Sequence, residues 1–359
     1  MTEPGARAPA GRRLVMWAAV LVVAAALAWV AREIPLAEVV AALRRLTAGE
    51  IAVLLLVNLG VTLVFSLRWW VILRLLGYSV PFVRLSSYRL AGFALSYLTP
   101  GTQFGGEPLQ IVLTHRRQAV PVEAATAAVV IDRAVELLGN FTFLAFGLVL
   151  SLRLRLIRGE EAGVLGVLAV ALLALPLGFL GMALSGHKPL TWLLKRMPGL
   201  WTGRALGWTT VTQWAEATED QIVAFCRERP GGLVVAMGLS LVSWTAIVFE
   251  YALMLSFLAI RLDLLQVVGV ITASRLALLL PVPGGLGALE TSQVLALAAL
   301  GYSRAEGLGL GLLIRARDLL FALAGLGLAA GYTRRLRLSP PDPPRAADAG
   351  PTERTQPQA

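Results

Sequence analysis

The sequence predicts an all-α polytopic membrane protein with about six transmembrane helices and two re-entrant broken hairpins, arranged as an inverted repeat. Of its 359 residues, 57% are hydrophobic and only 15% are charged, and the mean hydropathy is +0.72. Long apolar runs separated by short basic segments make up most of the chain. Two further stretches place proline, glycine and glutamate inside apolar sequence, which predicts helices that break at membrane depth.

The composition also argues against several classes of function. A net charge of +10 would suggest nucleic-acid binding in a soluble chain, but the basic residues mostly flank apolar runs and are better explained by orientation in a membrane. Cys226 is the single cysteine and the two histidines lie far apart, so neither an intrachain disulfide nor a Cys/His metal site is expected. The common phosphate-loop, hydrolase and metalloprotease motifs are missing. We therefore expect no enzyme activity, no cofactor and no nucleic-acid partner.

The integral membrane domain is expected to span residues 14–332, between a disordered basic N-terminus at 1–13 and a disordered proline-rich tail at 333–359. The first apolar run could be a cleaved signal peptide, but an uncleaved anchor fits a chain that is itself embedded in the membrane. A bilayer needs about 20 apolar residues for one crossing. Six runs meet this length: 14–31, 51–76, 121–152, 164–184, 233–260 and 307–332.

Three segments outside these runs carry a separate prediction. Residues 32–50 are expected to form a short surface helix, and the Arg68-Trp69-Trp70 cluster is typical of a membrane–water boundary. Residues 187–229 are expected to form an amphipathic cytoplasmic segment, which either lies on the lipid headgroups or docks on the bundle. Its apolar face repeats at helical spacing through Trp208, Val211, Ala215, Thr218, Ile222 and Phe225.

Each broken stretch has a Pro-Gly pair followed by further glycines and a glutamate. The first runs from Pro100 to Glu107 and the second from Pro283 to Glu290. In lipid, an interrupted backbone is tolerated only where protein or a water-filled cavity surrounds it. The apolar arms on either side of the first break are too short to cross singly, which favours a re-entrant hairpin. The residues that break the helices are expected to be Pro100, Gly101, Gly105, Gly106, Pro283, Gly284, Gly285 and Gly287.

These features recur at a constant distance along the chain. The first Pro-Gly-Glu pattern maps onto the second with an offset of 183, and Arg133-x-x-Glu136 recurs as Arg315-x-x-Asp318 with an offset of 182. This predicts two repeat units, at about 51–152 and 233–332. An odd number of crossings separates them, so the second unit would be inverted. The basic residues favour cytoplasmic termini in a bacterial inner (plasma) membrane.

Ionisable residues deep in apolar sequence are the candidate site, because a charge at that depth is costly unless it is paired or hydrated. One alternative is purely structural: an arginine paired with an acid of its own helix, as Arg133 with Glu136 and Arg315 with Asp318. For the glutamates after the breaks, helix capping is the alternative to binding an amine or carrying a proton. The arginines would receive a phosphate. The candidates are Glu107, Glu290, Asp132, Arg133, Glu136, Arg275, Arg315, Arg317 and Asp318.

Three motifs resemble the flippase-like transmembrane domain of lysylphosphatidylglycerol synthases. They are Pro100 to Gln110 with Arg116-Arg117, Val129 to Glu136, and Pro281 to Glu290. Two departures matter: Gln110 stands where the family pattern Gly-Glu-x-x-Arg has arginine, and the acids of Glu-Arg-x-x-Asp are exchanged at Asp132 and Glu136. The resemblance implies lipid translocation. No segment after residue 332 resembles the soluble aminoacyl-transfer domain, so lysyl transfer is not implied.

The resulting expectation is a lipid translocase, or flippase, that moves a phosphate-containing lipid across the inner membrane. The lipid could be aminoacylated or polyprenyl-linked, and its identity, direction of transport and energy coupling stay open. The alternative is a membrane-embedded enzyme, such as a glycosyltransferase that acts on a polyprenyl-phosphate lipid. A non-transporting scaffold is a third option. Expected partners are membrane lipids, with a homo-oligomer and a separate lipid-modifying enzyme as further options.

Overall fold

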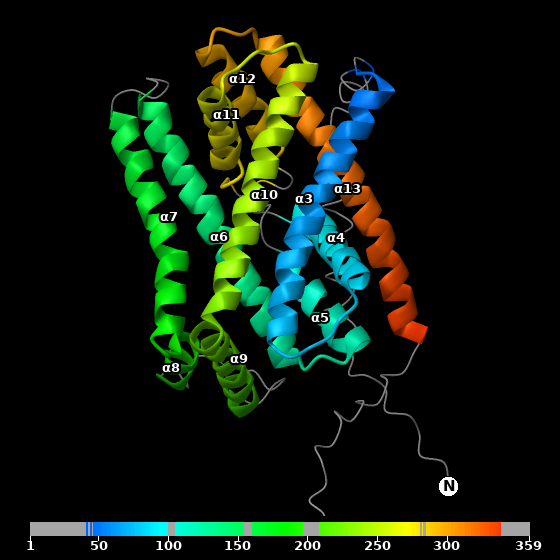
Figure 1. Ribbon diagram of the computed structural model, residues 1–359, viewed down its shortest axis with the longest axis vertical. Coiled ribbons are helices and arrows are strands. Elements are labelled where there is room, and N and C mark those ends of the chain that lie inside the picture. The colour runs from blue at the N-terminus through cyan, green and yellow to red at the C-terminus, as the bar shows by residue number, and fades with distance from the viewer. Residues whose placement is uncertain are drawn as a thin grey trace, which may run out of the picture.

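The computed structural model describes residues 41, 44, 46–99, 105–153, 160–196, 208–280, 282 and 285–338, and every regular element within these ranges is a helix (Figure 1). The all-α class predicted from the sequence is therefore confirmed. Several predictions lie outside the described residues. They are the first apolar run at 14–31, most of the surface helix at 32–50, both disordered ends apart from residues 333–338, and Pro100, Gly101, Pro283 and Gly284.

Within the described ranges, four helices are long and apolar enough to cross a membrane, and each overlaps a predicted run. They are α3 (Ala48–Leu75), α6 (Val122–Arg153), α7 (Glu160–Leu184) and α10 (Pro230–Phe257). A fifth, α13 (Arg304–Leu338), covers the last predicted run and carries three charges near its middle. Its 35 residues extend about 50 Å at 1.5 Å per residue, more than the roughly 30 Å of hydrocarbon in a bilayer. The protein is thus a polytopic membrane protein.

Both predicted breaks appear as gaps between pairs of short helices. The first pair is α4 (Phe82–Leu98) and α5 (Glu107–Gln118), and the second is α11 (Leu264–Ala277) and α12 (Ala288–Ala299). Figure 1 shows the pair α4 and α5 toward the end of the bundle opposite to α11 and α12. The order of a long helix, a broken pair and a long helix therefore occurs twice along the chain.

Glycines in the breaks meet two different requirements. Gly105, Gly285 and Gly287 have φ angles of 141°, 61° and 75°, a region in which glycine avoids the penalty of a side chain. Gly106 has an ordinary φ of −88°, but a Cβ there would lie 2.0 Å from the carbonyl oxygen of Gly92 in α4. The start of α5 can therefore lie against α4 only because position 106 lacks a side chain.

Long helices from the two halves of the chain pack against each other. Helix α3 lies along α10, and α4 lies along α13 (Figure 1). The second contact is close at Gly325, where an added Cβ would lie 2.2 Å from the carbonyl oxygen of Leu90. Small residues allow such backbone approach between membrane helices. The two halves therefore form one bundle, and the space between them is the setting for the candidate site.

The predicted amphipathic segment forms α8 (Pro189–Arg196) and α9 (Trp208–Glu228), which dock on the bundle. Ala215, Thr218, Ile222 and Phe225 of the predicted face are buried, and α9 packs on α6, α7 and α10. The carboxylate of Glu219 accepts hydrogen bonds from the first backbone N–H groups of α8, at 2.8 Å each. Of the two alternatives for this segment, the structure shows docking.

Candidate functional site

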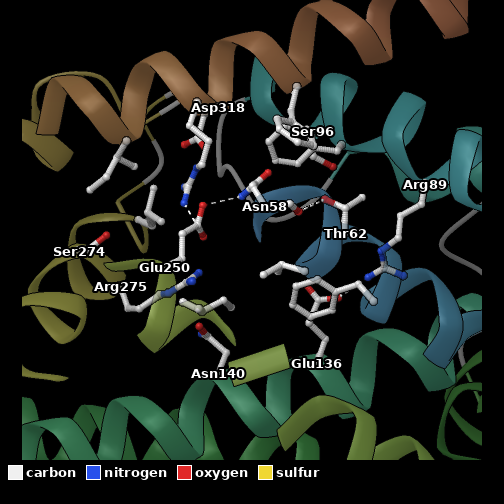
Figure 2. A pocket seen from close by; sticks show the side chains of 18 of the residues that line it. Asn58, Thr62, Arg89, Ser96, Glu136, Asn140, Glu250, Ser274, Arg275 and Asp318 are labelled. Carbon is white, nitrogen blue, oxygen red and sulfur yellow. Dashed lines mark hydrogen bonds and ion pairs between the residues drawn. The ribbon is translucent and has the colours of Figure 1, made fainter. Parts of the chain in front are cut away.

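A cavity of about 270 Å³ lies between the two halves of the bundle. Its walls come from α3, α4, α5 and α6 of the first half and from α10, α11, α12 and α13 of the second. Figure 2 shows side chains of both charges and several amides and hydroxyls pointing into this space. Among the described residues, the charged side chains that line it are four arginines and four acids: Arg89, Arg133, Arg275, Arg317, Glu107, Glu136, Glu250 and Asp318.

On one side of the cavity, two arginines bind two acids of α6. Asp132 and Glu136 lie one helical turn apart and therefore share a face. Arg68 of α3 donates to Asp132 at 2.6 Å and to Glu136 at 3.0 Å. Arg89 of α4 donates to the same two acids, at 2.8 and 2.9 Å. The four side chains neutralise one another and join α3, α4 and α6 inside the bundle.

The first break is joined to this cluster through Arg133. Its guanidinium lies 2.7 Å from a carboxylate oxygen of Glu107 and 2.9 Å from one of Glu136. Glu107, the first residue of α5, also accepts a hydrogen bond from the backbone N–H of Gly105 at 2.8 Å. Glu107 therefore both caps the new helix and pairs with a cavity arginine. Helix capping and a position in the cavity wall were alternatives for this glutamate, and the structure shows both.

The second break has its own arginine, Arg315, which is fully buried. Its guanidinium binds Glu290 of α12, with an Nε to carboxylate distance of 2.8 Å. It also donates to the hydroxyl of Tyr97 at 3.1 Å and to the carbonyl of Gly285 at 3.3 Å. Neither Arg315 nor Glu290 is among the residues that line the cavity. This pair lies behind the wall, where Leu289 and Ile314 face the space.

The alternative that paired Arg315 with Asp318 is wrong. Asp318 forms an ion pair with its neighbour Arg317, at 2.8 Å. Arg315 instead points toward α12 and binds Glu290. Arg317 also binds Glu250 of α10 at 3.0 Å, and Glu250 accepts a further hydrogen bond from Asn58 of α3 at 3.0 Å. The Glu250 side chain is only 1% exposed. One arginine thus serves two acids on this side of the cavity.

Arg275 differs from the other charged residues of the cavity. Its guanidinium lies 4.8 Å from the ring centre of Trp244, and its Nε is buried with no hydrogen-bond partner. No carboxylate of the described residues lies within ion-pair distance of it. The hydroxyl of the neighbouring Ser274 forms a hydrogen bond with the hydroxyl of Tyr251, at 2.9 Å between the oxygens. Arg275 is therefore a cation at the cavity wall that has no acid partner among the described residues and could receive an anion (Figure 2).

Six of the predicted site residues line the cavity. They are Glu107, Arg133, Glu136, Arg275, Arg317 and Asp318, and Asp132 lies just behind them. The described break glycines Gly105, Gly106, Gly285 and Gly287 lie between the paired short helices. The structure separates Glu290 and Arg315 from the cavity surface. In the described part of the chain, no group of three or more His, Cys, Asp or Glu residues could hold a metal ion.

Sequence reasoning missed several residues that complete the two charge clusters. Arg68 and Trp69 were interpreted as interfacial, but both side chains are fully buried. One turn further along α3, Arg74 is exposed, and its guanidinium lies 4.7 Å from the Trp70 ring. A useful signal was an arginine inside a short apolar arm, as at position 89. The other residues missed are Glu250 as an ion-pair partner, Asn58, Tyr97 and Trp244.

Comparison with known proteins agrees with the resemblance found in the motifs. Residues 16–325 match the family model described as the lysylphosphatidylglycerol synthase TM region. The chain is also 22% identical over 273 residues to a UPF0104 membrane protein of Methanothermobacter thermautotrophicus, covering 74% of this chain and 80% of that protein. No solved structure matches the chain significantly. The match covers most of the chain and all the residues that line the cavity, and the protein therefore belongs to the lysylphosphatidylglycerol synthase transmembrane-region family.

Proposed function

We propose that this protein is a lipid translocase that moves a phosphate-containing lipid between the leaflets of the inner membrane. The observation that carries the proposal is the cavity between the two halves of the bundle, with four arginines and four acids on its wall. Charges at membrane depth are costly unless they are paired or hydrated, and they commonly mark a substrate path. A lipid headgroup needs such a polar place during its passage between leaflets.

The charges of the wall suit a headgroup that contains phosphate. Guanidinium groups bind phosphate in a bidentate manner, and Arg275 has no carboxylate partner among the described residues. Acids of the same wall, such as Glu107 and Asp318, are 21% and 22% exposed and could receive an amine. An aminoacylated or a polyprenyl-linked lipid phosphate would both fit this chemistry.

We further propose that the two halves form an inverted repeat and that transport occurs by rocking of one half against the other. The repeated element order and the placement of the broken pairs at opposite ends of the bundle support this (Figure 1). Hydrogen bonds cross between the halves at Asn58 to Glu250 and at Arg315 to Tyr97. Such contacts would have to break and re-form as the cavity opens to either side. Both termini would be cytoplasmic.

Transport is favoured over catalysis by the state of the acids. A general base must be free to accept a proton from its substrate. Every carboxylate that lines the cavity has an arginine partner: Arg133 binds Glu107 and Glu136, and Arg317 binds the other two. We therefore propose no enzymatic role for this chain, and membrane lipids as its principal partners.

Reconstitution tests the proposal directly. Purified protein would be placed in liposomes that contain a trace of fluorescent glycerophospholipid, and dithionite would be added outside to bleach the outer leaflet. We expect faster loss of the inner-leaflet signal than in protein-free liposomes. Glu107→Gln with Asp318→Asn should slow this at least tenfold, since both acids line the cavity. The control is Lys195→Gln, which removes an exposed ion pair of α8. Unchanged rates in the double variant would contradict the proposal.

A further inference from the structure

A second cavity, with a volume of about 340 Å³, opens between α6 and α10. It is almost entirely apolar, and its rim includes Phe146, Met237 and Leu241, which are 56%, 37% and 70% exposed. Both helices are long and apolar enough to cross a membrane. At this position the surrounding solvent is lipid hydrocarbon. The natural occupant of this groove is therefore a hydrocarbon chain from the bilayer.

Trp244 of α10 forms a wall common to the groove and the polar cavity. Its ring stacks on Phe143 of α6 with the centroids 4.4 Å apart. The two helices approach closely here, because a Cβ at Gly139 would lie 2.8 Å from the Trp244 indole nitrogen. The guanidinium of Arg275 lies 4.8 Å from the same ring. A single side chain thus separates an apolar groove from the one cavity arginine that lacks an acid partner among the described residues.

A ligand that binds both Arg275 and the apolar groove must carry an anion and a hydrocarbon chain a short distance apart. A free anion would leave the groove empty, and an uncharged lipid would leave Arg275 without a partner. A glycerophospholipid has both parts. Bound here, its phosphate would lie at the guanidinium in the cavity and one acyl chain would lie in the groove, on either side of Trp244.

We propose that the protein binds an anionic glycerophospholipid across Trp244, with the phosphate at Arg275 and one acyl chain in the groove between α6 and α10. This deepens and rests on the proposed translocase function, since it names the chemical class of the lipid and its lateral route. Arg275 selects the anion, and the apolar groove between α6 and α10 receives the chain.

Photo-crosslinking of the full-length protein in phosphatidylcholine vesicles tests this. Two probes would carry the same diazirine acyl chain: phosphatidic acid and diacylglycerol, which differ only in the phosphate. Mass spectrometry would locate the labelled residues. We expect phosphatidic acid to label the groove residues of α6 and α10 at least fivefold more than diacylglycerol. Equal labelling by the two probes would overturn the proposal.

Matched variants separate the two parts of the site. Arg275→Gln should remove the preference for phosphatidic acid, and Arg275→Lys, which keeps the charge, should retain most of it. Thr142→Trp, at an exposed groove position, should reduce groove labelling at least fivefold. Val149→Trp, on the same helix, 56% exposed and outside the groove, should not. Retention of the preference in Arg275→Gln would overturn the proposal.

Two further results distinguish this inference from the translocase function. Preferential groove labelling without any translocation would support the binding site and contradict the function. Translocation with no groove labelling would overturn the binding site alone. Groove labelling by a diazirine polyprenyl phosphate, with none by phosphatidic acid, would overturn the assignment of a glycerophospholipid.

Discussion

Arg315 of α13 donates a hydrogen bond to the hydroxyl of Tyr97 in α4 at 3.1 Å, although 218 positions separate the two residues. Tyr97 lies in the last turn before the first break. The same guanidinium donates to the carbonyl of Gly285 in the second break. Close by, Leu98 and Leu286 share one apolar cluster on α13. The two breaks, which recur at a constant offset in the sequence, therefore meet at a single arginine.

Removal of the Tyr97 hydroxyl should weaken this junction. Tyr97→Phe is expected to lower the free energy of unfolding by about 1 kcal/mol, the order of magnitude of one hydrogen bond between helices of a membrane protein. Thermal unfolding in detergent would measure it. Tyr302→Phe is the control, because that hydroxyl bonds an exposed backbone carbonyl, of Arg261. An equal effect of the two substitutions would contradict a special role for the junction.

Arg68 should contribute far more to stability than Arg74 of the same helix. The Arg68 side chain is fully buried and serves Asp132 and Glu136, whereas Arg74 is exposed and stacks on Trp70. Removing one member of a buried ion pair leaves an uncompensated charge, at a cost of about 3–5 kcal/mol. We expect Arg68→Met to lower the melting temperature in detergent strongly and Arg74→Met to change it little. Similar melting temperatures would restore the interfacial interpretation.

A methyl group at position 106 should disturb the first break. The Cβ of Gly106→Ala would lie 2.0 Å from the carbonyl oxygen of Gly92, so α5 must move away from α4. The expected result is loss of thermal stability and of lipid translocation. Gly60→Ala is the matched control, since nothing lies within 4 Å of a Cβ there. A fully stable and active Gly106→Ala protein would show that the two helices do not approach so closely.

The single cysteine should resist thiol reagents in the native protein. Cys226 lies buried in α9, and burial raises the pKa of its thiol from 9.0 to about 11, so the reactive thiolate is about a hundredfold rarer at neutral pH. The folded state holds this proton more tightly, so its contribution to stability falls as the pH rises from 9 toward 11.

Gel-shift labelling with a polyethylene-glycol maleimide at pH 7.5 would check the protection of Cys226. We expect little modification of Cys226 in the native protein and complete modification once the protein is unfolded in detergent. A cysteine introduced by Thr210→Cys, at an exposed position of the same helix, should react at once. Rapid native labelling at Cys226 would show that α9 is not docked as described.

The spans and breaks were predictable because each depends on local composition. Apolar runs of sufficient length identify α3, α6, α7 and α10, and Pro-Gly pairs mark the interruptions. The docking of α9 could not be decided in this way. An amphipathic face has the same periodicity whether lipid headgroups or other helices cover it. Only the positions of α6, α7 and α10 show that its apolar side is covered by protein.

The site was predicted in part because charges within apolar runs are conspicuous. Residues such as Arg133 and Arg317 were identified only because they lie far from the ends of apolar runs. Their partners were not, since a pairing between helices depends on which face each helix turns inward. Arg315 illustrates this: Asp318 is nearest in sequence, but Glu290 of another helix binds it. Arg68 was misassigned because tryptophan beside arginine is typical of a membrane interface, whereas here Arg68 and Trp69 are both buried.

Arg317 binds two acids, whereas Arg275 binds none among the described residues. This difference affects how a membrane potential would act on the protein. The ionisable side chains that line the cavity in the described part of the chain carry equal numbers of opposite charges, so together they have no net formal charge. An anion bound at Arg275 would make the cavity negative by one unit. A membrane potential would then act on the loaded protein and not on the empty one, with up to about 2.3 kcal/mol for each 100 mV. The voltage across the membrane could thereby set the preferred direction of an otherwise passive exchange.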